Sequence, residues 1–187
     1  MPGINPPPGK SSPRMDKPNA GTFESQVLPH LDAAFGLARW LVRSDTDAED
    51  RVQDAYLRAW KSFAGFRGGD AKAWLLAIVR NACYTWLKSR RLENLSTPFD
   101  EEVHAPWDAA DDPHARLASD RDRQAIRRAV EALPVEFREV LVLREWQGCS
   151  YREISEIADI PIGTVMSRLV RARERLQKSL ARSGGEG

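Results

Sequence analysis

Arginine and hydroxyl side chains recur along one edge of residues 161–176, whose sequence is PIGTVMSRLVRARERL. At helical spacing this edge carries Thr164, Arg168, Arg171 and Arg175, with Ser167 beside them. A guanidinium group can bind a phosphate or the edge of a guanine through two hydrogen bonds, and a hydroxyl group suits either contact. These residue types indicate a helix that binds nucleic acid, although a solvated helix without a ligand has a similar composition.

A second pattern in the same segment indicates how this helix is held. Val165, Leu169, Ala172 and Leu176 repeat at steps of four, three and four, so the opposite edge is expected to pack against another helix. The sequence Ser150-Tyr151-Arg152-Glu153 is a capping box, which predicts a short helix carrying Ile154, Ile157 and Ala158. Only residues 159–161 separate the two helices. This arrangement is that of a helix-turn-helix, whose second helix enters the major groove of duplex DNA.

Aromatic and basic residues alternate in a second segment, residues 71–91. Trp74, Asn81 and Lys88 are seven residues apart and share a helical face, and further basic and aromatic residues lie nearby at Arg80, Tyr84, Arg90 and Arg91. Rings stack on unpaired bases, cations follow the phosphate backbone, and an amide can read an extruded base. The residue types of this segment therefore indicate that it binds single-stranded DNA. Trp86 is expected in the hydrophobic core instead, whereas Trp74 is equally compatible with either position.

A third candidate surface lies on the predicted helix that ends near Ser62. Its polar face carries Asp50, Gln53, Asp54, Leu57 and Lys61. A leucine within a polar stripe is the kind of exposed anchor that helix-on-helix interfaces use. The alternative is a solvated face stabilised by pairs of opposite charge.

The hydrophobic periodicity predicts an all-α fold of two small helical domains joined by a flexible acidic linker, because no run of period-two alternation is present. We expect one helix over residues 24–43 that buries Leu28, Leu31, Phe35, Ala38 and Val42. A second helix should begin at the capping box Thr46-Asp47-Ala48-Glu49. Asp70 should cap a third helix over about 71–91 that buries Leu75, Ile78, Ala82 and Trp86. Helices should resume near Arg116, and Pro134 should begin the next one, which ends at residues 146–148.

Composition divides the chain into four parts. Residues 1–22 are rich in Pro, Gly and Ser and are expected to be a disordered tail, within which Met15 is an alternative start. One domain covers 23–93, an acidic linker covers 94–114, and the helix-turn-helix domain covers 115–183. Residues 93–114 hold seven acidic and no basic residues, whereas residues 162–182 hold six basic residues and one acidic residue. Such separation of charge suggests separate partners.

Several function classes are disfavoured. There is no Ser/His/Asp grouping, no Gly-rich phosphate loop and no metal-ligand spacing, so we expect no enzyme activity, no cofactor and no metal. The sequence contains no run of eighteen apolar residues, so no membrane span is predicted. The N-terminus has no apolar segment typical of a secretory signal. Cys83 and Cys149 are expected to be reduced thiols of a cytoplasmic protein, with a redox pair as the alternative.

Three segments, taken in order, resemble bacterial sigma factors of the extracytoplasmic-function group. DAEDRVQDAYLRAW (residues 47–60) resembles that family's segment for binding core polymerase, and FRGGDAKAWLLAIVRNACYTWLKSRR (residues 66–91) resembles its promoter-melting segment. ALPVEFREVLVLRE (residues 132–145) and CSYREISEIADIPIGTVMSRLVRARERL (residues 149–176) resemble its C-terminal DNA-binding region. The resemblance covers most of residues 23–180.

This resemblance implies a role for each surface. The face with Leu57 would bind the clamp helices of the polymerase large subunit. The flipped base and melted strand of the downstream promoter element would be held by Phe66, Arg67, Asp70, Trp74, Arg80, Asn81, Tyr84, Lys88, Arg90 and Arg91. The upstream element would be read by Ser150, Tyr151, Thr164, Ser167, Arg168, Arg171 and Arg175. Met166 departs from members that carry a basic residue there, which removes one possible DNA contact.

The partners implied by the resemblance are core RNA polymerase, through its clamp and flap, promoter DNA in duplex and single-stranded form, and an anti-sigma factor. The free chain is expected to be a monomer without membrane insertion, and the linker is expected to mimic nucleic-acid charge within the polymerase. Two rivals remain. A helix-turn-helix regulator would bind a palindromic duplex without polymerase. An adaptor would bind polymerase without reading DNA.

Overall fold

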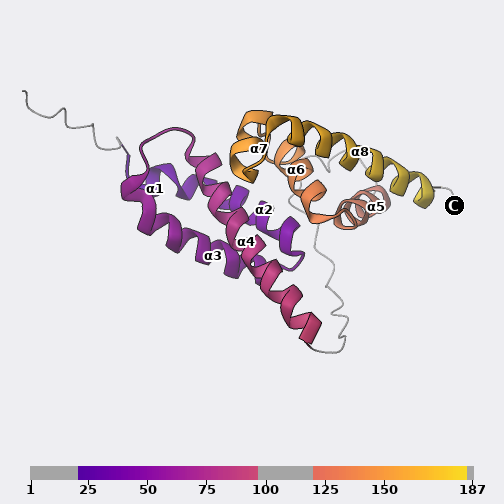
Figure 1. Ribbon diagram of the computed structural model, residues 1–187, viewed down its shortest axis with the longest axis horizontal. Coiled ribbons are helices and arrows are strands. Elements are labelled where there is room, and N and C mark those ends of the chain that lie inside the picture. The colour runs from indigo at the N-terminus through magenta and orange to yellow at the C-terminus, as the bar shows by residue number, and fades with distance from the viewer. Residues whose placement is uncertain (1–20, 97–119, 185–187) are drawn as a thin grey trace, which may run out of the picture.

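The computed structural model describes residues 21–96 and 120–184, and every regular element within those ranges is a helix (Figure 1). The first half contains α1 (Phe23–Gln26), η1 (Leu28–His30), α2 (Leu31–Val42), α3 (Asp45–Ser62), η2 (Phe63–Gly65) and α4 (Ala71–Ser96). The second half contains α5 (Asp120–Glu131), α6 (Val135–Glu145), α7 (Tyr151–Ala158) and α8 (Ile162–Gly184). The all-α prediction is confirmed. No helix in the described ranges is both long and apolar enough to cross a membrane.

The expected single helix over residues 24–43 is wrong, because the chain forms three shorter elements there. Pro29 lies in the first turn of η1, where its missing N–H and its ring prevent a regular helix from continuing. The interruption changes which side chains are buried. Leu28 and Leu31 are 46% and 47% exposed instead of buried, while α2 buries Leu37 and Leu41 completely.

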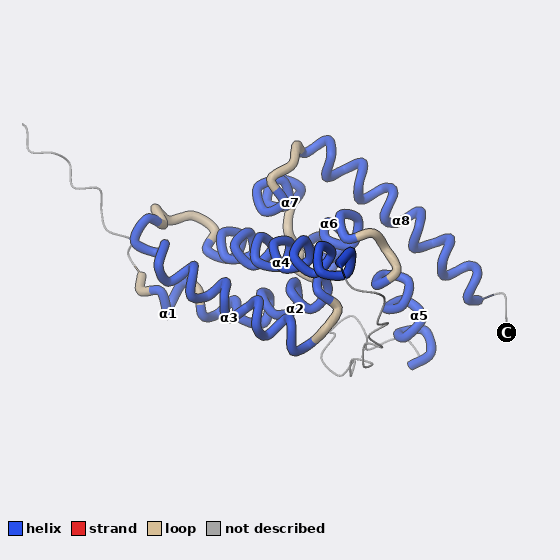
Figure 2. The backbone as a smooth tube through the Cα atoms, turned by 60° about the horizontal axis from the view of Figure 1, so that its bottom comes forward, coloured by secondary structure: helices blue, strands red, loops and turns tan. Residues whose placement is uncertain are grey.

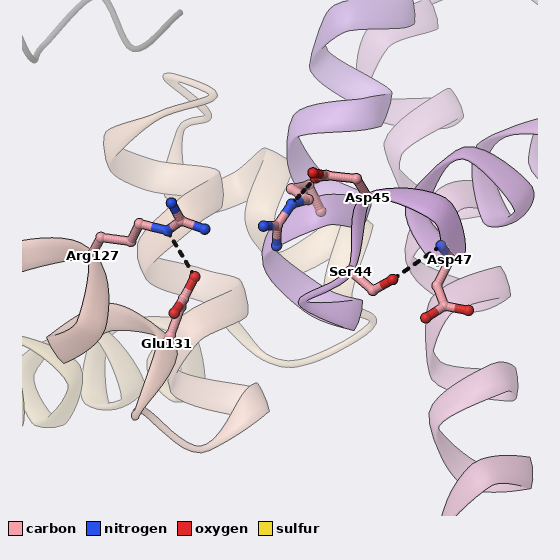
Figure 3. Close-up of polar contacts among 6 residues, drawn as sticks. Ser44, Asp45, Asp47, Arg127 and Glu131 are labelled. Atoms are coloured by element: carbon pink, nitrogen blue, oxygen red, sulfur yellow. Dashed lines mark hydrogen bonds and ion pairs between the residues drawn. The ribbon is translucent and has the colours of Figure 1, made fainter. Parts of the chain in front are cut away.

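The start of α3 also differs from the prediction. Ser44 is the N-cap, and its Oγ accepts a hydrogen bond from the Asp47 backbone N–H at 3.3 Å (Figure 3), so Thr46 lies inside the first turn. Beginning the helix at Ser44 places the Asp45 and Asp47 carboxylates in its first turn, where the helix dipole favours negative charge. Asp45 also forms an ion pair with Arg39 of α2, which fixes the connection between the two helices.

Removal of this cap provides a test of the observed helix start. Replacing Ser44 with alanine should lower the free energy of unfolding by about 1 kcal/mol, because a backbone N–H at the start of α3 loses its acceptor. Urea unfolding followed by circular dichroism measures the change. Thr46→Ala is the matched control and should have little effect. A larger loss for Thr46→Ala than for Ser44→Ala would contradict Ser44 as the N-cap of α3.

The long helix α4 packs against α2 and α3 and completes the first half. Asp70 caps it as predicted, since its Oδ1 accepts a hydrogen bond from the Ala73 N–H at 3.1 Å. Leu75 and Ala82 are buried, and Ile78 and Trp86 are partly buried. The helix continues to Ser96, into the segment predicted as linker, whereas residues 97–114 of that linker and the expected helix start at 116 lie outside the described residues.

The helix-turn-helix prediction for the second half agrees with the structure. Ser150 and Glu153 form the predicted capping box at the start of α7, with hydrogen bonds of 3.2 Å and 2.6 Å. The turn into α8 uses Asp159 in a left-handed conformation, with φ of 52°. It is closed by the Ser155 hydroxyl, which donates to the Ile160 carbonyl at 2.5 Å. The predicted buried line of α8 holds at Val165, Leu169 and Ala172, and Leu176 is partly buried.

The two halves are in direct contact. α7 packs across α4 and α6 packs against α2 (Figures 1 and 2). Buried side chains from both halves form one continuous hydrophobic cluster, in which the rings of Trp40 and Trp146 are 5.3 Å apart. The described part of the chain is therefore one packed unit, although its sequence is divided into two.

Candidate nucleic-acid interface

The outer face of α8 presents the polar and basic side chains predicted from the sequence. Ser167, Arg171 and Arg175 are exposed, and Thr164 and Arg168 are partly exposed. The helix is positioned by α6 and α7, which cover its apolar edge. The guanidinium of Arg175 lies 5.0 Å from the ring centroid of Phe137 in α6, and this cation–π contact orients the Arg175 side chain. Ser167 donates to the Thr164 carbonyl at 3.0 Å.

The other predicted contacts of the helix-turn-helix have structural partners. Ser150 is engaged in the capping box. The ring of Tyr151 lies 5.1 Å from the Arg144 guanidinium. Exposed apolar side chains also line one edge of α8, at Ile162, Met166 and Val170. This apolar edge was not predicted as a surface, although its i, i+4, i+8 spacing is readable in the sequence.

On α4 the predicted residues lie on one side of the helix but differ in whether another helix covers them. Asn81, Lys88 and Arg91 are exposed. Arg80 and Tyr84 instead face α6, where both bind Glu139, and the Arg80 guanidinium also stacks 4.2 Å from the Tyr84 ring centroid. The ten predicted residues therefore do not form one open surface in this structure.

Aromatic packing fixes the turn before α4. The Phe66 ring is 9% exposed and lies 4.8 Å from the Trp74 ring and 5.9 Å from the Phe63 ring, measured between centroids. Arg67 and Asp70 are exposed beside this cluster. Trp74 is partly buried, so it lies neither fully in the hydrophobic core nor fully on the DNA-binding face, the two alternatives that the sequence left open.

The end of α4 carries a further aromatic and basic group. The Arg90 guanidinium lies 5.1 Å from the Trp86 ring centroid and 3.5 Å from a carboxylate oxygen of Asp47 in α3. Arg90 thus links the end of α4 to the start of α3. This contact holds one predicted DNA-binding residue in place beside the exposed Arg91.

Comparisons with known proteins identify the family of the chain. The family model described as "Sigma-70 region 2" matches residues 27–93, and the family model described as "Sigma-70, region 4" matches residues 123–176. The ECF RNA polymerase sigma-E factor of Escherichia coli strain K12 is 33% identical over 174 residues, which cover 89% of this chain and 91% of that protein. The RNA polymerase sigma-H factor of Pseudomonas aeruginosa is 30% identical over 175 residues, covering 89% and 90%.

The chain belongs to the ECF group of RNA polymerase sigma factors. It acts in transcription initiation, as the members of this family do. Among solved structures, the sigma factor RpoE from Bartonella quintana, in complex with the anti-sigma factor NepR, is similar with a TM-score of 0.72 and 33% identity over 85% of this chain and 96% of that chain. CnrH, solved with the cytosolic domain of CnrY, shares the fold, with a TM-score of 0.60 and 24% identity.

One surface residue of this sigma factor was missed in the sequence. Trp60 is 59% exposed on α3, one turn from Leu57, which is 57% exposed. The Phe23 and Trp60 rings are in edge-to-face contact, at a centroid distance of 5.1 Å. The i, i+3 spacing of a leucine and a tryptophan was the available signal. Asp50, Gln53 and Lys61 are exposed on the same helix, and Asp54 is paired with Arg51 at 3.5 Å.

Proposed function

We propose that this sigma factor binds core RNA polymerase and directs it to promoters by reading two separate DNA elements. The observation that carries the proposal is the outer face of α8, where Ser167, Arg171 and Arg175 are exposed on a helix whose direction is fixed by a capped partner helix and a closed turn. That geometry supports entry of α8 into the major groove of the upstream element. The polymerase, not this chain, performs the chemistry.

We assign binding of polymerase to α3. Leu57 and Trp60 form an exposed apolar pair, surrounded by Asp50, Gln53 and Lys61. An apolar centre with a polar rim is the usual composition of a protein interface. The proposed partner is the clamp of the polymerase large subunit.

We assign the melted downstream element to α4 and the turn before it. Asn81 offers an amide for an extruded base, while Lys88 and Arg91 offer charge for the backbone of the opened strand. Trp74 and Phe66 would support this turn by packing rather than by stacking on DNA, because both are in contact with Phe63. Arg80 and Tyr84 would join the surface once α6 has moved away.

An anti-sigma factor is a further proposed partner. RpoE and CnrH, whose folds are similar, were each solved with a regulatory protein, the anti-sigma factor NepR and the cytosolic domain of CnrY. The proposed site of action is the cytoplasm, where bacterial polymerase works. The domain boundaries at 23–93 and 115–183 remain proposals alongside this assignment, and the family matches at 27–93 and 123–176 support them.

Run-off transcription from a randomised promoter library tests the proposed function. Purified bacterial core polymerase is used with and without this chain, and transcripts that appear only with it should share an upstream and a downstream element. If no transcript appears and the chain alone shifts duplex DNA, a plain helix-turn-helix regulator replaces this proposal. If the chain only co-elutes with polymerase, an adaptor replaces it.

Met166 allows a test of the upstream contact by gain of function. Its side chain is 51% exposed on the outer part of α8. Met166→Lys should tighten binding to the recovered upstream duplex by about 3- to 10-fold and steepen the salt dependence by about one counterion, because a phosphate contact is added. Fluorescence anisotropy over a range of salt concentrations measures both. Ile126→Lys adds the same charge on α5, which lies beside the C-terminal part of α8 (Figure 1), and should change neither value. An equal gain for both variants would contradict the assignment.

A further inference from the structure

The contact between the two halves is built from polar groups as well as apolar ones. The Lys72 ammonium of α4 donates to the Gln147 carbonyl at 2.6 Å, and the Arg138 guanidinium of α6 donates to the Leu41 carbonyl of α2 at 3.3 Å. Burial lowers the pKa of Arg138 to about 10. Such groups are solvated when the halves separate, so the contact is easier to open than a purely apolar core.

The centre of this contact is a carboxylate of α6 held by α4. The Glu139 side chain is completely buried, and its two oxygens accept from Arg80 Nε at 2.5 Å and from the Tyr84 hydroxyl at 2.9 Å. Burial raises the pKa of Glu139, and this shift is opposed by the hydrogen bonds from Arg80 and Tyr84 and by the positive charges of Arg80 and of Arg168 on α8. The Glu139 carboxylate is thus held by two side chains of α4, and the positive charge of Arg168 on α8 also stabilises its ionised form.

Arg80 and Tyr84 are also the groups that a single strand of DNA would use. A guanidinium binds a backbone phosphate, and a phenol ring stacks on a base. In this structure the phosphate partner is replaced by the Glu139 carboxylate. The surface of α4 that carries Arg80 and Tyr84 cannot hold α6 and a DNA strand at the same time.

We propose that Glu139 occupies the single-stranded DNA surface of α4 as an internal competitor, so that docking of the two halves and binding of the melted strand are mutually exclusive. The proposal rests on the function assigned to α4 above. The free chain is then closed and binds single-stranded DNA weakly, and its apparent affinity is reduced by the small fraction of molecules that are open. Separation of α6 from α4 exposes Arg80 and Tyr84.

Glu139→Gln should weaken the closed state, because it leaves the partly buried Arg80 guanidinium without its anionic partner. We expect the variant to bind a fluorescein-labelled pool of random 12-nucleotide single strands about 10-fold more tightly than the unmodified sequence does. Glu145→Gln is the matched control on the same helix, since Glu145 is exposed and its ion pair within the described residues is with Arg173 of α8, at 2.7 Å. Its affinity should be unchanged.

Energy transfer between dyes on the two halves reports opening directly. Arg58→Cys on α3 and Lys178→Cys on α8 are exposed labelling positions. Native Cys83 and Cys149 are buried, and burial raises their pKa values to about 12 and 11, so they react slowly with maleimide dyes. Transfer should be high in the labelled chain, lower with Glu139→Gln, and lowered in the chain with native Glu139 by a saturating amount of the 12-nucleotide pool.

Two results would overturn the proposal: unchanged transfer in Glu139→Gln, or unchanged transfer when the chain with native Glu139 is saturated with the single strands. The second arm needs no substitution at Glu139 and decides the matter if Glu139→Gln does not fold. If either result is found and the chain still supports promoter-specific run-off transcription, the proposed function is retained and only the proposal of internal competition by Glu139 is rejected. If no variant binds single strands and no specific transcript forms, both proposals fail.

Discussion

Replacing Leu57 with aspartate should raise the Kd of this sigma factor for core RNA polymerase by about 30-fold or more. Leu57 forms the exposed apolar pair on α3 together with Trp60. A carboxylate placed in a dry interface without a partner weakens binding by on the order of 2 kcal/mol. Because the leucine is 57% exposed in the free chain, its replacement should leave the free energy of unfolding nearly unchanged. Competition with a labelled copy of the native chain for core polymerase measures the loss.

Ile126→Asp on α5 is the control for this substitution. It places the same charge on an exposed apolar position that belongs to none of the proposed surfaces. Duplex binding by α8 should be the same in both variants. A Leu57→Asp chain that competes for polymerase as well as the native one would contradict the assignment of α3.

Replacing Arg171 with alanine should lower promoter-specific transcription by about 5- to 150-fold. Arg171 is exposed on the outer face of α8, between the hydroxyl of Ser167 and the guanidinium of Arg175. Loss of a guanidinium that grips a base through two hydrogen bonds costs about 1–3 kcal/mol, which is the source of this range. Run-off transcription from a promoter recovered in the library measures it.

Arg171→Lys separates two explanations of that loss. A lysine keeps the charge but not the planar pair of donors, so base reading should be lost while a phosphate contact should persist. We expect Arg171→Lys to relax the preference at one position of the upstream element. Lys178→Ala, two turns further along α8, should change neither rate nor preference. An Arg171→Ala chain that transcribes normally would show that α8 does not read the element through this residue.

Local signals in the sequence predicted much of the fold. The capping box at Ser150, the cap at Asp70 and the buried line through Val165 and Leu169 depend on residues within one or two helical turns, and all of them agree with the structure. In the first half, the predicted start of α3 failed because two local signals competed. Thr46 had the spacing of a capping box, but Ser44 offered a cap two residues earlier with acidic residues in the first turn.

The contacts between the halves could not be predicted in the same way. Glu139 bonds to Arg80 and Tyr84 across 59 and 55 residues of sequence, and a charged residue next to an arginine gives no sign that it is buried. For the same reason Arg80 and Tyr84 were placed with Asn81 and Lys88, since helical spacing gives the face of a residue but not its partner. The local pattern therefore named candidate DNA-binding residues without indicating which of them the free chain covers.

Dependence of transcription on spacer length tests two-element recognition most directly. Promoters recovered from the library would be rebuilt with one to five base pairs inserted or deleted between the upstream and downstream elements, and run-off transcription with core polymerase would be measured for each. Because α8 and α4 belong to one chain bound to one polymerase, we predict a narrow optimum and a loss of at least about 10-fold within a few base pairs on either side. Transcription that is independent of the spacing would contradict recognition of both elements by this chain.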